Sequence, residues 1–292
     1  MPAYGRNQTA QFLKIKSRRF LIDCGEATQH QLLRYKIKAQ KLNAIFISHL
    51  HGDHYLGLVG LLSTLHLQGR KDELHLYGPK GLNDIITLQL RSSETIFGYE
   101  LIFHSVDTTS SYVLYEDSKV EVTTIPLKHR IPCCGFIFRE KAKPIRINKE
   151  KIPPKFPLQW IAKLKKGEDI VNDNDVVLHK NEDLTLPPKH SRSYAYCSDT
   201  IYDRSLIPLV KNVDLLYHET TFLHEKEIWA TNTFHSTTTQ AATIAKDAKV
   251  GRLLIGHFSA RYSDLSPFVK ESRSVFNQTV LAMEGKCFSL KE

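Results

Sequence analysis

The segment Ile47-Ser48-His49-Leu50-His51-Gly52-Asp53-His54 constrains this chain more than any other, because it places three histidines and an aspartate within six positions. An apolar run, Ala44–Ile47, leads into it and is typical of a buried strand, and the apolar stretch Leu56–Leu67 follows with the pattern of a helix. The end of a buried strand is where α/β folds place their sites. The segment therefore predicts a metal site at a strand end of an α/β fold.

The ligand types narrow the metals that such a site can hold. Imidazole and carboxylate groups without a thiolate suit zinc, manganese or iron. Four ligands on one short loop cannot easily converge on one ion, and their alternation separates His49 and His51 from Asp53 and His54. The spacing favours two metal ions, each with further ligands elsewhere. The alternative is a polar loop that happens to be rich in histidine.

Composition and cysteine content limit the class of protein that this sequence can encode. Of the 292 residues, 41% are hydrophobic and 24% are charged, which excludes a disordered chain, a collagen-like repeat and a coiled coil. The five cysteines are an odd number and form no CxxC pair, so we expect neither a disulfide framework nor a cysteine-type zinc site. The sequence has no signal-like N-terminal stretch and no apolar run of about 18 residues. We therefore expect a cytoplasmic protein without a membrane segment.

The positive charge is concentrated in two blocks. The net charge is +9, yet residues 1–41 hold nine basic and two acidic side chains, and residues 139–166 hold ten and two. The rest of the chain is therefore net acidic. Two basic blocks give the protein an electric field with a direction, which attracts a polyanion such as nucleic acid. The alternative is an ordinary basic surface.

The chain alternates short strand-like runs with helical stretches in both halves, which predicts layers of helix around central sheet. Residues 139–193 differ, because they are rich in Lys, Pro, Asn and Asp and poor in aliphatic runs. We predict one domain over residues 1–292, with an inserted arm over residues 140–192. After the arm, strands are expected at Tyr194–Cys197, Val213–Tyr217, Leu253–Ile255, Val280–Met283 and Cys287–Leu290, and a helix at Thr238–Ala248.

The HxHxDH motif after a strand resembles the metallo-β-lactamase superfamily, and further motifs resemble one family within it, ribonuclease Z, the tRNA 3′-processing endoribonucleases. The resemblance implies an αββα sandwich of the α/β class with a protruding basic arm. It extends in family order from about Arg6 to Phe276. The motifs that carry it are residues 20–34 (FLIDCGEATQHQLLR), 47–62, 77–81 (YGPKG), 126–129 (PLKH), 198–200 (SDT), 218–220 (HET), 235–242 and 257–262 (HFSARY).

The resemblance also implies the remaining metal ligands. By similarity, His49, His51 and His129 hold one zinc ion, Asp53, His54 and His257 hold a second, and Asp199 bridges the two. His129, Asp199 and His257 each follow a predicted strand, as the first four ligands do. Two-metal sites suit phosphodiester hydrolysis, because they activate a water and neutralise the charge that develops on the phosphoryl oxygens.

Four residues receive roles in the reaction or in substrate binding. Asp53 matches the family's general base, since one carboxylate oxygen can bind metal while the other accepts a proton. His235 is the candidate proton donor to the leaving oxygen, with Glu219 orienting its ring. The alternative for His235 is that it caps the helix beginning near Thr238. Arg261 is expected to bind a phosphate, with a salt bridge inside the fold as the alternative.

The arm is expected to hold the substrate. The segment 152–167 resembles the family's arm, which grips the tRNA elbow away from the cut, and its expected phosphate-binding residues are Lys155, Lys163, Lys165 and Lys166. The sequence departs from the family at Lys155-Phe156-Pro157, where a Gly-Pro pair usually follows the two prolines. It departs again at the start, because the family's first strand and glycine-rich turn precede the Arg6-Asn7 region, whereas this sequence begins at Met1-Pro2.

The sequence thus predicts a zinc-dependent endoribonuclease that removes the 3′ trailer from precursor tRNA and leaves a 3′-hydroxyl on the tRNA and a 5′-phosphate on the trailer. The two implied ligand sets would hold two zinc ions per subunit. Because the family is homodimeric, we also expect a homodimer. One alternative is a phosphodiesterase of the same fold that acts on small cyclic or aryl phosphodiesters. Another is a catalytically silent RNA-binding module, which would not need an intact ligand set.

Overall fold

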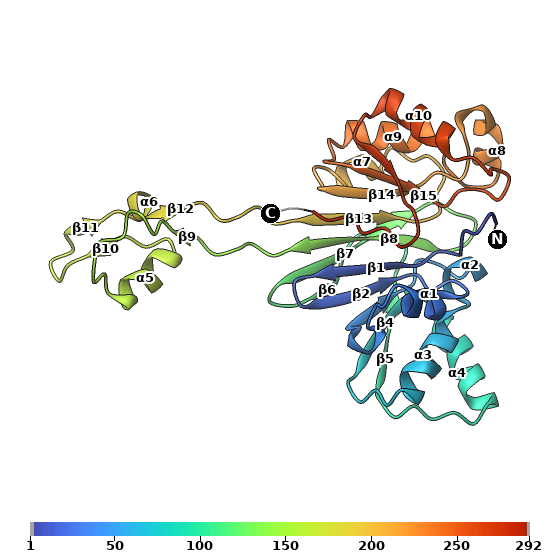
Figure 1. The fold of residues 1–292 in the computed structure, drawn as a ribbon, viewed down its shortest axis with the longest axis horizontal. Coiled ribbons are helices and arrows are strands. Elements are labelled where there is room, and N and C mark those ends of the chain that lie inside the picture. Colours follow the sequence, from blue (N-terminus) through green and yellow to red (C-terminus); the bar gives the residue numbers. More distant parts are fainter. Residues whose placement is uncertain (1–2, 291–292) are drawn as a thin grey trace.

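Two β-sheets packed face to face form the centre of the molecule, and helices cover both outer faces (Figure 1). The structure is a computed structural model that describes residues 3–290; the predicted domain boundaries at Met1 and Glu292, and the chain start at Met1-Pro2, lie outside the described residues. The layers are therefore helix, sheet, sheet, helix. This is the αββα sandwich of the α/β class that the resemblance implies.

The first half of the chain builds a five-stranded sheet in the order β1-β2-β3-β4-β5. Strands β2 to β5 are parallel, and β1 pairs antiparallel with β2 at the edge. The strands are β1 (Gln11–Ile15), β2 (Arg18–Ile22), β3 (Ala44–Phe46), β4 (Leu74–Pro79) and β5 (Leu101–Val106), and the helices are α1 (Thr28–Arg34), α2 (Gly52–Tyr55), α3 (Leu58–Leu67) and α4 (Leu82–Ser92).

The second half builds a seven-stranded sheet in the order β16-β15-β14-β13-β8-β7-β6. Strands β13 to β16 are parallel, whereas β6, β7 and β8 form an antiparallel meander. The strands are β6 (Val113–Glu116), β7 (Val120–Leu127), β8 (Cys133–Glu140), β13 (Ser193–Cys197), β14 (Leu215–Glu219), β15 (Leu253–Gly256) and β16 (Thr279–Leu281), and the helices are α7 (Leu206–Leu209), α8 (Glu227–Asn232), α9 (Thr238–Asp247) and α10 (Ser266–Val275).

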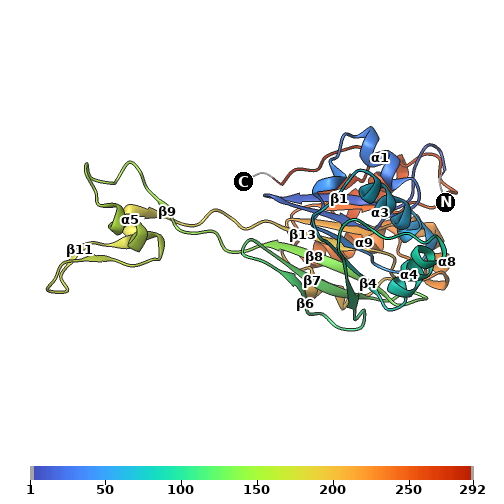
Figure 2. The same cartoon turned by 90° about the horizontal axis from the view of Figure 1, so that it is seen from below.

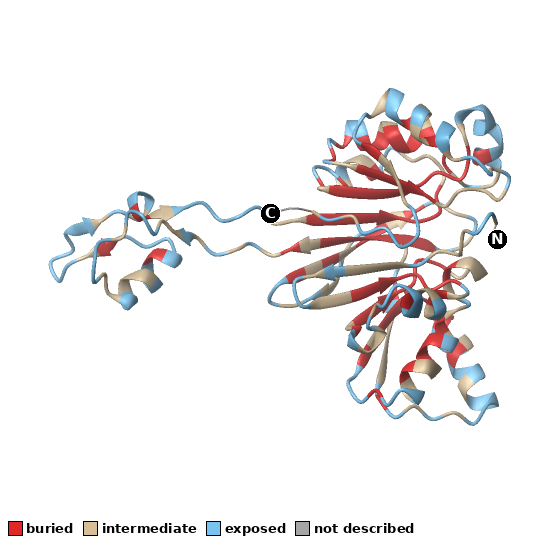
Figure 3. Cartoon of the chain, in the orientation of Figure 1, coloured by how far each residue is buried: buried red, intermediate tan, exposed pale blue. Residues whose placement is uncertain are grey.

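The inner faces of the two sheets meet in an aromatic core. Phe46 of β3 lies 5.3 Å from both Phe136 and Phe138 of β8, measured between ring centres, and Phe20 of β2 lies 5.5 Å from Phe138. Large flat side chains at these distances fill the space between sheets. Separate aliphatic cores lie on the outer faces, under α3 and α4 on one side and under α9 and α10 on the other. Buried residues accordingly run along the strands and the inward sides of these helices (Figure 3).

The segment between β8 and β13 forms an arm that extends away from the body (Figures 1 and 2). It carries its own small core, in which Leu164, Ile170 and Leu184 are buried and Phe156 and Trp160 pack against them. Its elements are β9 (Arg146–Ile147), α5 (Leu158–Lys165), β10 (Ile170–Val171), β11 (Val177–His179), α6 (Asn181–Leu184) and β12 (Thr185–Leu186). The fold prediction, an αββα sandwich with a protruding arm, is confirmed.

Some predicted elements differ from the observed ones. The predicted strand Cys287–Leu290 is wrong, because residues 282–290 form neither helix nor strand. Phe288 and Leu290 do pack against the inter-sheet core, so the alternating pattern reflects burial without a hydrogen-bonded ladder. The strand expected at Val213–Tyr217 instead covers Leu215–Glu219, and thus carries Glu219 to the end of the sheet. Among the described residues, no helix has both the length and the apolar character needed to cross a membrane.

Candidate metal centre and proton donor

The predicted ligands come together at one end of the two sheets, because each follows the carboxyl end of a strand. His49 to His54 follow β3 of the five-stranded sheet, and the other ligands follow strands of the seven-stranded sheet. The two sheets are joined at this point by a hydrogen bond from the backbone N–H of Cys134 to the carbonyl of Ser48, of 3.1 Å. His129 follows β7, Asp199 follows β13 and His257 follows β15. The site therefore exists only where the two halves of the chain meet.

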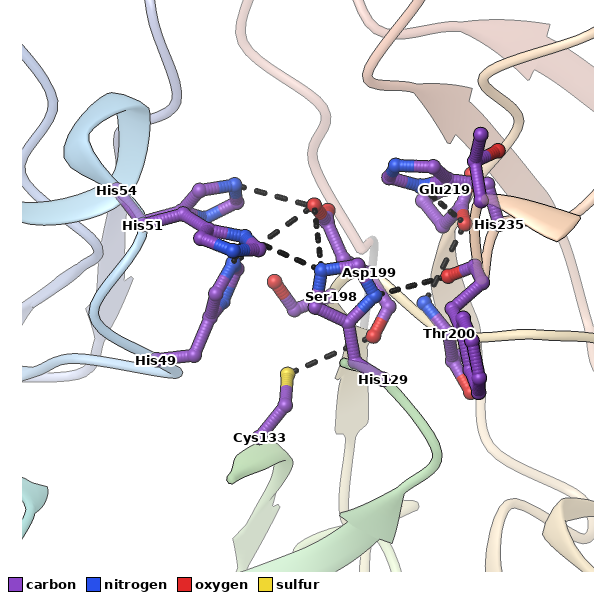
Figure 4. A network of polar contacts seen from close by, with 12 residues as sticks. His49, His51, His54, His129, Cys133, Ser198, Asp199, Thr200, Glu219 and His235 are labelled. Carbon is purple, nitrogen blue, oxygen red and sulfur yellow. Dashed lines mark hydrogen bonds and ion pairs between the residues drawn. The ribbon is translucent and has the colours of Figure 1, made fainter. Parts of the chain in front are cut away.

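The first ligand group contains three imidazoles and one carboxylate. His51 Nδ1 lies 3.1 Å from His49 Nε2 and 3.1 Å from His129 Nε2. Asp199 Oδ2 lies 3.7 Å from His49 Nε2 and 3.9 Å from His129 Nε2. Four ligand atoms thus surround one point, as Figure 4 shows for the side chains.

The second ligand group uses the other oxygen of the same aspartate. Asp199 Oδ1 lies 3.3 Å from His257 Nε2 and 3.6 Å from His54 Nε2. Asp53 Oδ2 lies 3.4 Å from His257 Nε2 and 3.7 Å from His54 Nε2. Asp199 therefore presents one oxygen to each group, which is the arrangement of a carboxylate between two cations.

Polar groups fix the orientation of four ligand rings through the ring nitrogen that faces away from the centre. His54 Nδ1 lies 2.8 Å from Asp23 Oδ2, and His257 Nδ1 lies 2.9 Å from the hydroxyl of Thr221. His49 Nδ1 lies 3.0 Å from the hydroxyl of Ser48, and His129 Nδ1 lies 2.9 Å from the carbonyl of Phe234. Such outer hydrogen bonds hold a ring's tautomer and direct its other nitrogen at a metal.

The donor set and its unpaired atoms fit metal ions. His54 Nε2 and Asp199 Oδ1 are buried without a hydrogen-bond partner, and a buried polar atom left unpaired is costly unless another ligand satisfies it. Burial lowers the pKa of His49 to about 2, so its ring is neutral and its Nε2 carries a free lone pair. Burial opposes ionisation of Asp199, but the rings of His257 and His54 hold its pKa well below the usual value, so it is a carboxylate. Nitrogen and oxygen donors without thiolate suit zinc among other divalent metals.

His235 and Glu219 form a separate pair beside the ligands. His235 Nδ1 lies 3.1 Å from Glu219 Oε1, and Glu219 is fully buried at the end of β14. Burial disfavours a charged His235 ring, but the adjacent Glu219 carboxylate outweighs burial and raises the pKa of His235 to about 9. The ring is therefore protonated at neutral pH. The cap of α9 is instead Thr237, in a capping box with Gln240, so the alternative role of His235 as a helix cap is wrong.

Three residues that touch this site have left-handed backbone conformations. Asp23 has a φ of 56°, Phe234 of 58° and His257 of 61°. Such conformations cost non-glycine residues roughly 1–3 kcal/mol each and are typical of functional sites. The surrounding contacts hold all three in place, since each provides or orients a group at the centre.

Sequence reasoning missed two residues that organise the centre. Asp23 is fully buried and accepts hydrogen bonds from the Ser48 N–H (2.7 Å) and the Tyr196 hydroxyl (2.6 Å) in addition to its contact with His54. Thr221 contacts Glu219, His235 and His257 through one hydroxyl. The signal for Asp23 was a carboxylate directly after the buried strand Phe20–Ile22. Thr221 had no sequence signal.

The remaining predicted substrate-binding residues lie in two places. Arg261 is exposed and lies in the loop that follows the ligand His257. Lys155, Lys163, Lys165 and Lys166 are exposed on the arm, at the opposite end of β8 from the metal ligands. The substrate-binding roles of all five stay predictions.

Comparison with known proteins settles the family. The chain is 49% identical over 291 residues to the ribonuclease Z of Cytophaga hutchinsonii, an alignment that covers 100% of this chain and 93% of the relative. It is 46% identical to the ribonuclease Z of Bacteroides fragilis, over 99% of this chain and 95% of the relative.

The chain belongs to the ribonuclease Z family. The resemblance seen in the motifs is thus confirmed, and the chain is a hydrolase of the metallo-β-lactamase superfamily. Among solved structures, human tRNase Z, short form, superposes with a TM-score of 0.71 at 27% identity, covering 98% of this chain and 94% of that chain. A family model described as anti-Pycsar protein Apyc1 also matches residues 3–144, which is less than half of the chain.

Proposed function

We propose that this protein is a zinc-dependent endoribonuclease that removes the 3′ trailer from precursor tRNA. The observation that carries the proposal is Asp199, whose two oxygens face two separate groups of ligands with the His235–Glu219 pair alongside. That arrangement supplies what phosphodiester hydrolysis needs, namely charge neutralisation, an activated water and a proton for the leaving oxygen. The names of the relatives, ribonuclease Z and tRNase Z, agree with this chemistry and give the substrate class.

The proposed ligands are the seven residues predicted from the sequence. His49, His51, His129 and Asp199 would hold one zinc ion, and Asp53, His54, His257 and Asp199 would hold the second. When bound, two zinc ions supply Lewis-acid activation of water and stabilisation of charge on the phosphoryl oxygens. Asp53 Oδ2 faces the rings of His54 and His257, so its other oxygen is available to take the proton of the attacking water.

His235 is the proposed proton donor. The oxygen that leaves the phosphorus is the 3′-oxygen of the tRNA, and it needs a proton to depart as a hydroxyl. Glu219 keeps the His235 ring protonated and oriented, and Thr200, Thr221 and Ser236 fix Glu219 through hydrogen bonds to its carboxylate. The products are a tRNA with a 3′-hydroxyl and a trailer with a 5′-phosphate.

The position of the arm supports a homodimer. The arm leaves the body at the end of β8 and returns at the start of β13, whereas His129 and Asp199 lie at the other ends of these strands. The eight residues of β8 span about 25 Å, so one chain's arm extends away from its own metal centre. Two subunits would let the arm of one hold a tRNA whose 3′ end lies in the site of the other. We propose this dimer, and with it a cytoplasmic enzyme, since precursor tRNA is found there.

The decisive experiment is incubation of the purified protein with a 3′-extended tRNA transcript, with and without a chelator, followed by mapping of the product ends. We expect one cut at the 3′ side of the acceptor stem, a 3′-hydroxyl on the tRNA, and loss of cleavage on chelation that added zinc restores. Undiminished cleavage after complete metal removal would contradict the proposed centre. Metal analysis of the purified protein gives the identity and number of the ions.

The competing function is hydrolysis of small cyclic or aryl phosphodiesters. Such substrates need the metal centre but not the arm, so arm removal separates the two functions. Lys141 and Ser191 lie beside each other at the root of the arm, where the Ser191 hydroxyl donates to the Lys141 carbonyl at 3.1 Å. A short glycine-serine loop in place of residues 142–190 therefore closes the sheet without leaving half of the arm core behind. We expect tRNA cleavage to fall at least 100-fold while hydrolysis of an aryl phosphodiester is unchanged. Unchanged tRNA cleavage would favour the competing function.

A further inference from the structure

Trp229 is an exposed aromatic residue with no part in the ligand groups or the proton-donor pair. It lies on α8 and is 50% exposed, although tryptophan is usually well buried in a folded protein. Its neighbour Ile228 is 80% exposed, and Phe234, between α8 and His235, is 38% exposed. The helix thus presents apolar side chains to solvent immediately before the proton donor in the chain.

Trp229 is in contact with Arg261 from the loop of His257. The guanidinium carbon of Arg261 lies over the indole, 5.2 Å from the ring centre, which is a cation–π contact. Ser259 also holds this arginine, since its hydroxyl accepts from the Arg261 backbone at 3.3 Å and from Nη1 at 3.4 Å. Among the described residues, these contacts of Arg261 include no ion pair with a carboxylate. The alternative role of Arg261 in a salt bridge is therefore not seen, and its charge is available to a ligand.

The backbone fixes Trp229 relative to His235. The N–H of His235 donates to the carbonyl of Ala230 at 2.8 Å, and the carbonyl of Trp229 accepts from the N–H of Thr233 at 3.0 Å. The indole is therefore attached to the same compact turn as the proton donor. Arg261 is attached to the same loop as the ligand His257, so the Trp229–Arg261 contact joins the two loops that border the centre.

We propose that Trp229 and Arg261 form a stacking platform for the base of the last nucleotide retained in the tRNA. This inference rests on the proposed function, in which His235 protonates the 3′-oxygen of that same nucleotide. The base is joined to the ribose that carries the leaving oxygen, so it must lie on the side of the centre where His235 and α8 are. A flat indole and a planar guanidinium stack on any nucleobase, while the guanidinium N–H groups can still bind a phosphate oxygen.

The platform makes Trp229 a positioning residue. A stacked base fixes the ribose, and the ribose fixes the scissile phosphate relative to the metal ions and to His235. Misplacement of the reacting group lowers the rate of the chemical step as well as the affinity. We therefore expect Trp229→Ala to lower kcat as well as raise KM, with a total loss of about tenfold in kcat/KM, in the range found for removal of one base–aromatic stack.

A pair of substrates separates stacking from a general structural effect. One is a 3′-extended tRNA with a normal base at the last retained position, and the other has an abasic ribose at that position. Trp229→Ala should lower kcat/KM about tenfold on the normal substrate and change it little on the abasic one. Removing the indole and the base separately and together forms a double-mutant cycle, which isolates the interaction between these two groups. Trp229→Phe keeps a flat ring and should recover most of the loss. Ile228→Ala, next to it and more exposed, is the matched control and should cleave both substrates like the wild type.

Fluorescence gives a readout that does not depend on cleavage. The protein has two tryptophans, Trp160 in the arm and Trp229, so Trp160→Phe leaves Trp229 as the only indole. Binding of mature tRNA that ends at the last retained nucleotide should quench this fluorescence in the metal-loaded enzyme. The same tRNA with a terminal abasic ribose should bind with little quenching.

The possible results distinguish a failure of the stacking platform from a failure of the proposed function. If the wild type does not cleave the 3′-extended tRNA at all, the proposed function fails. If the wild type cleaves it but Trp229→Ala loses equally on the normal and abasic substrates, the platform is wrong. If the loss instead disappears with an abasic ribose at the first trailer position, the assignment to the retained base is overturned.

Discussion

The metal centre and the arm are built in opposite ways. The side chains of His49 and His54 are fully buried and that of Asp199 is 4% exposed, and four ligand rings are each held by an outer hydrogen bond. The arm has only three buried residues, and its lysines Lys163, Lys165 and Lys166 project into solvent from α5 or its end. Bond cleavage depends on fixed distances, which burial provides. Binding of phosphates depends on unpaired charge, which exposure provides.

Charge is distributed unevenly within the arm itself. Residues 139–166 hold ten basic and two acidic side chains, whereas residues 167–192 hold three basic and six acidic ones. The basic part includes α5, and the acidic part includes the β10–β11 hairpin and α6. Only the first part is suited to a polyanion. The arm is therefore not a uniformly basic surface, and substitutions in its two parts should have different effects.

The largest expected effect comes from a substitution in the metal centre. Asp53→Ala removes a proposed ligand and the proposed base, and should lower kcat by about 10³-fold or more on both a 3′-extended tRNA and an aryl phosphodiester. Steady-state kinetics and metal analysis on the same sample measure it. Asp84→Ala, at an exposed position of α4, is the control and should change neither. Full-rate cleavage by Asp53→Ala would contradict its role.

The next effect distinguishes the proton donor from the ligands. His235→Ala should lower kcat by about 10²-fold on tRNA, whose 3′-oxygen needs a proton, and far less on a nitrophenyl phosphodiester, whose leaving group departs as a stable anion. Equal losses on both substrates would argue for a structural role.

A pH profile tests the partner of the proton donor. Glu219 raises the pKa of His235, so the protonated, active form persists to higher pH in the wild type. Glu219→Gln removes that charge, and the fall of kcat/KM on the alkaline side should move to lower pH. Thermal unfolding checks that the variant is folded. An alkaline limb that does not move would contradict the coupling.

A smaller effect is expected from substitutions in the basic part of the arm. Replacement of Lys163, Lys165 and Lys166 by alanine should raise KM for tRNA about tenfold at moderate salt and reduce the salt dependence of binding, because fewer counterions are released. Hydrolysis of the aryl phosphodiester should not change. The matched control is Asp173→Ala with Asp175→Ala in the acidic part, which should not weaken tRNA binding. A salt dependence equal to that of the wild type would mean that these lysines do not contact phosphates.

The smallest effect concerns the root of the arm. Glu140 forms ion pairs there with Arg192 and Lys143. Burial opposes ionisation of the Glu140 carboxyl, but Arg192 outweighs burial and lowers the pKa of Glu140 to about 2. Glu140→Gln should loosen the junction and raise KM for tRNA about two- to threefold, a small effect because the amide still accepts hydrogen bonds and the side chains of both cationic partners reach solvent. Glu116→Gln, which affects the exposed pair with Lys141, is the comparison and should have no effect.

The sequence predicted most of what local chemistry and strand order control. The alternation of apolar runs and helical stretches indicated layers, and the position of His129, Asp199 and His257 after strands indicated one edge. The departure at Lys155 also has a structural meaning, since this residue adopts a φ of 63°, a conformation that glycine adopts more readily. The lysine therefore occupies a strained turn. The strand predicted at Cys287–Leu290 failed because burial of alternate residues does not by itself produce a ladder.

What the sequence alone determined is the kind of chemistry, because ligand types and their spacing in His49–His54 depend on the covalent chain. What only the tertiary structure decided is which atoms meet. Three contacts join segments that are far apart in the chain. The two oxygens of Asp199 face two different ligand groups, Asp23 contacts His54, and Trp229 contacts Arg261. Such contacts depend on how two sheets pack, and periodicity within one segment carries no information about the distance to another.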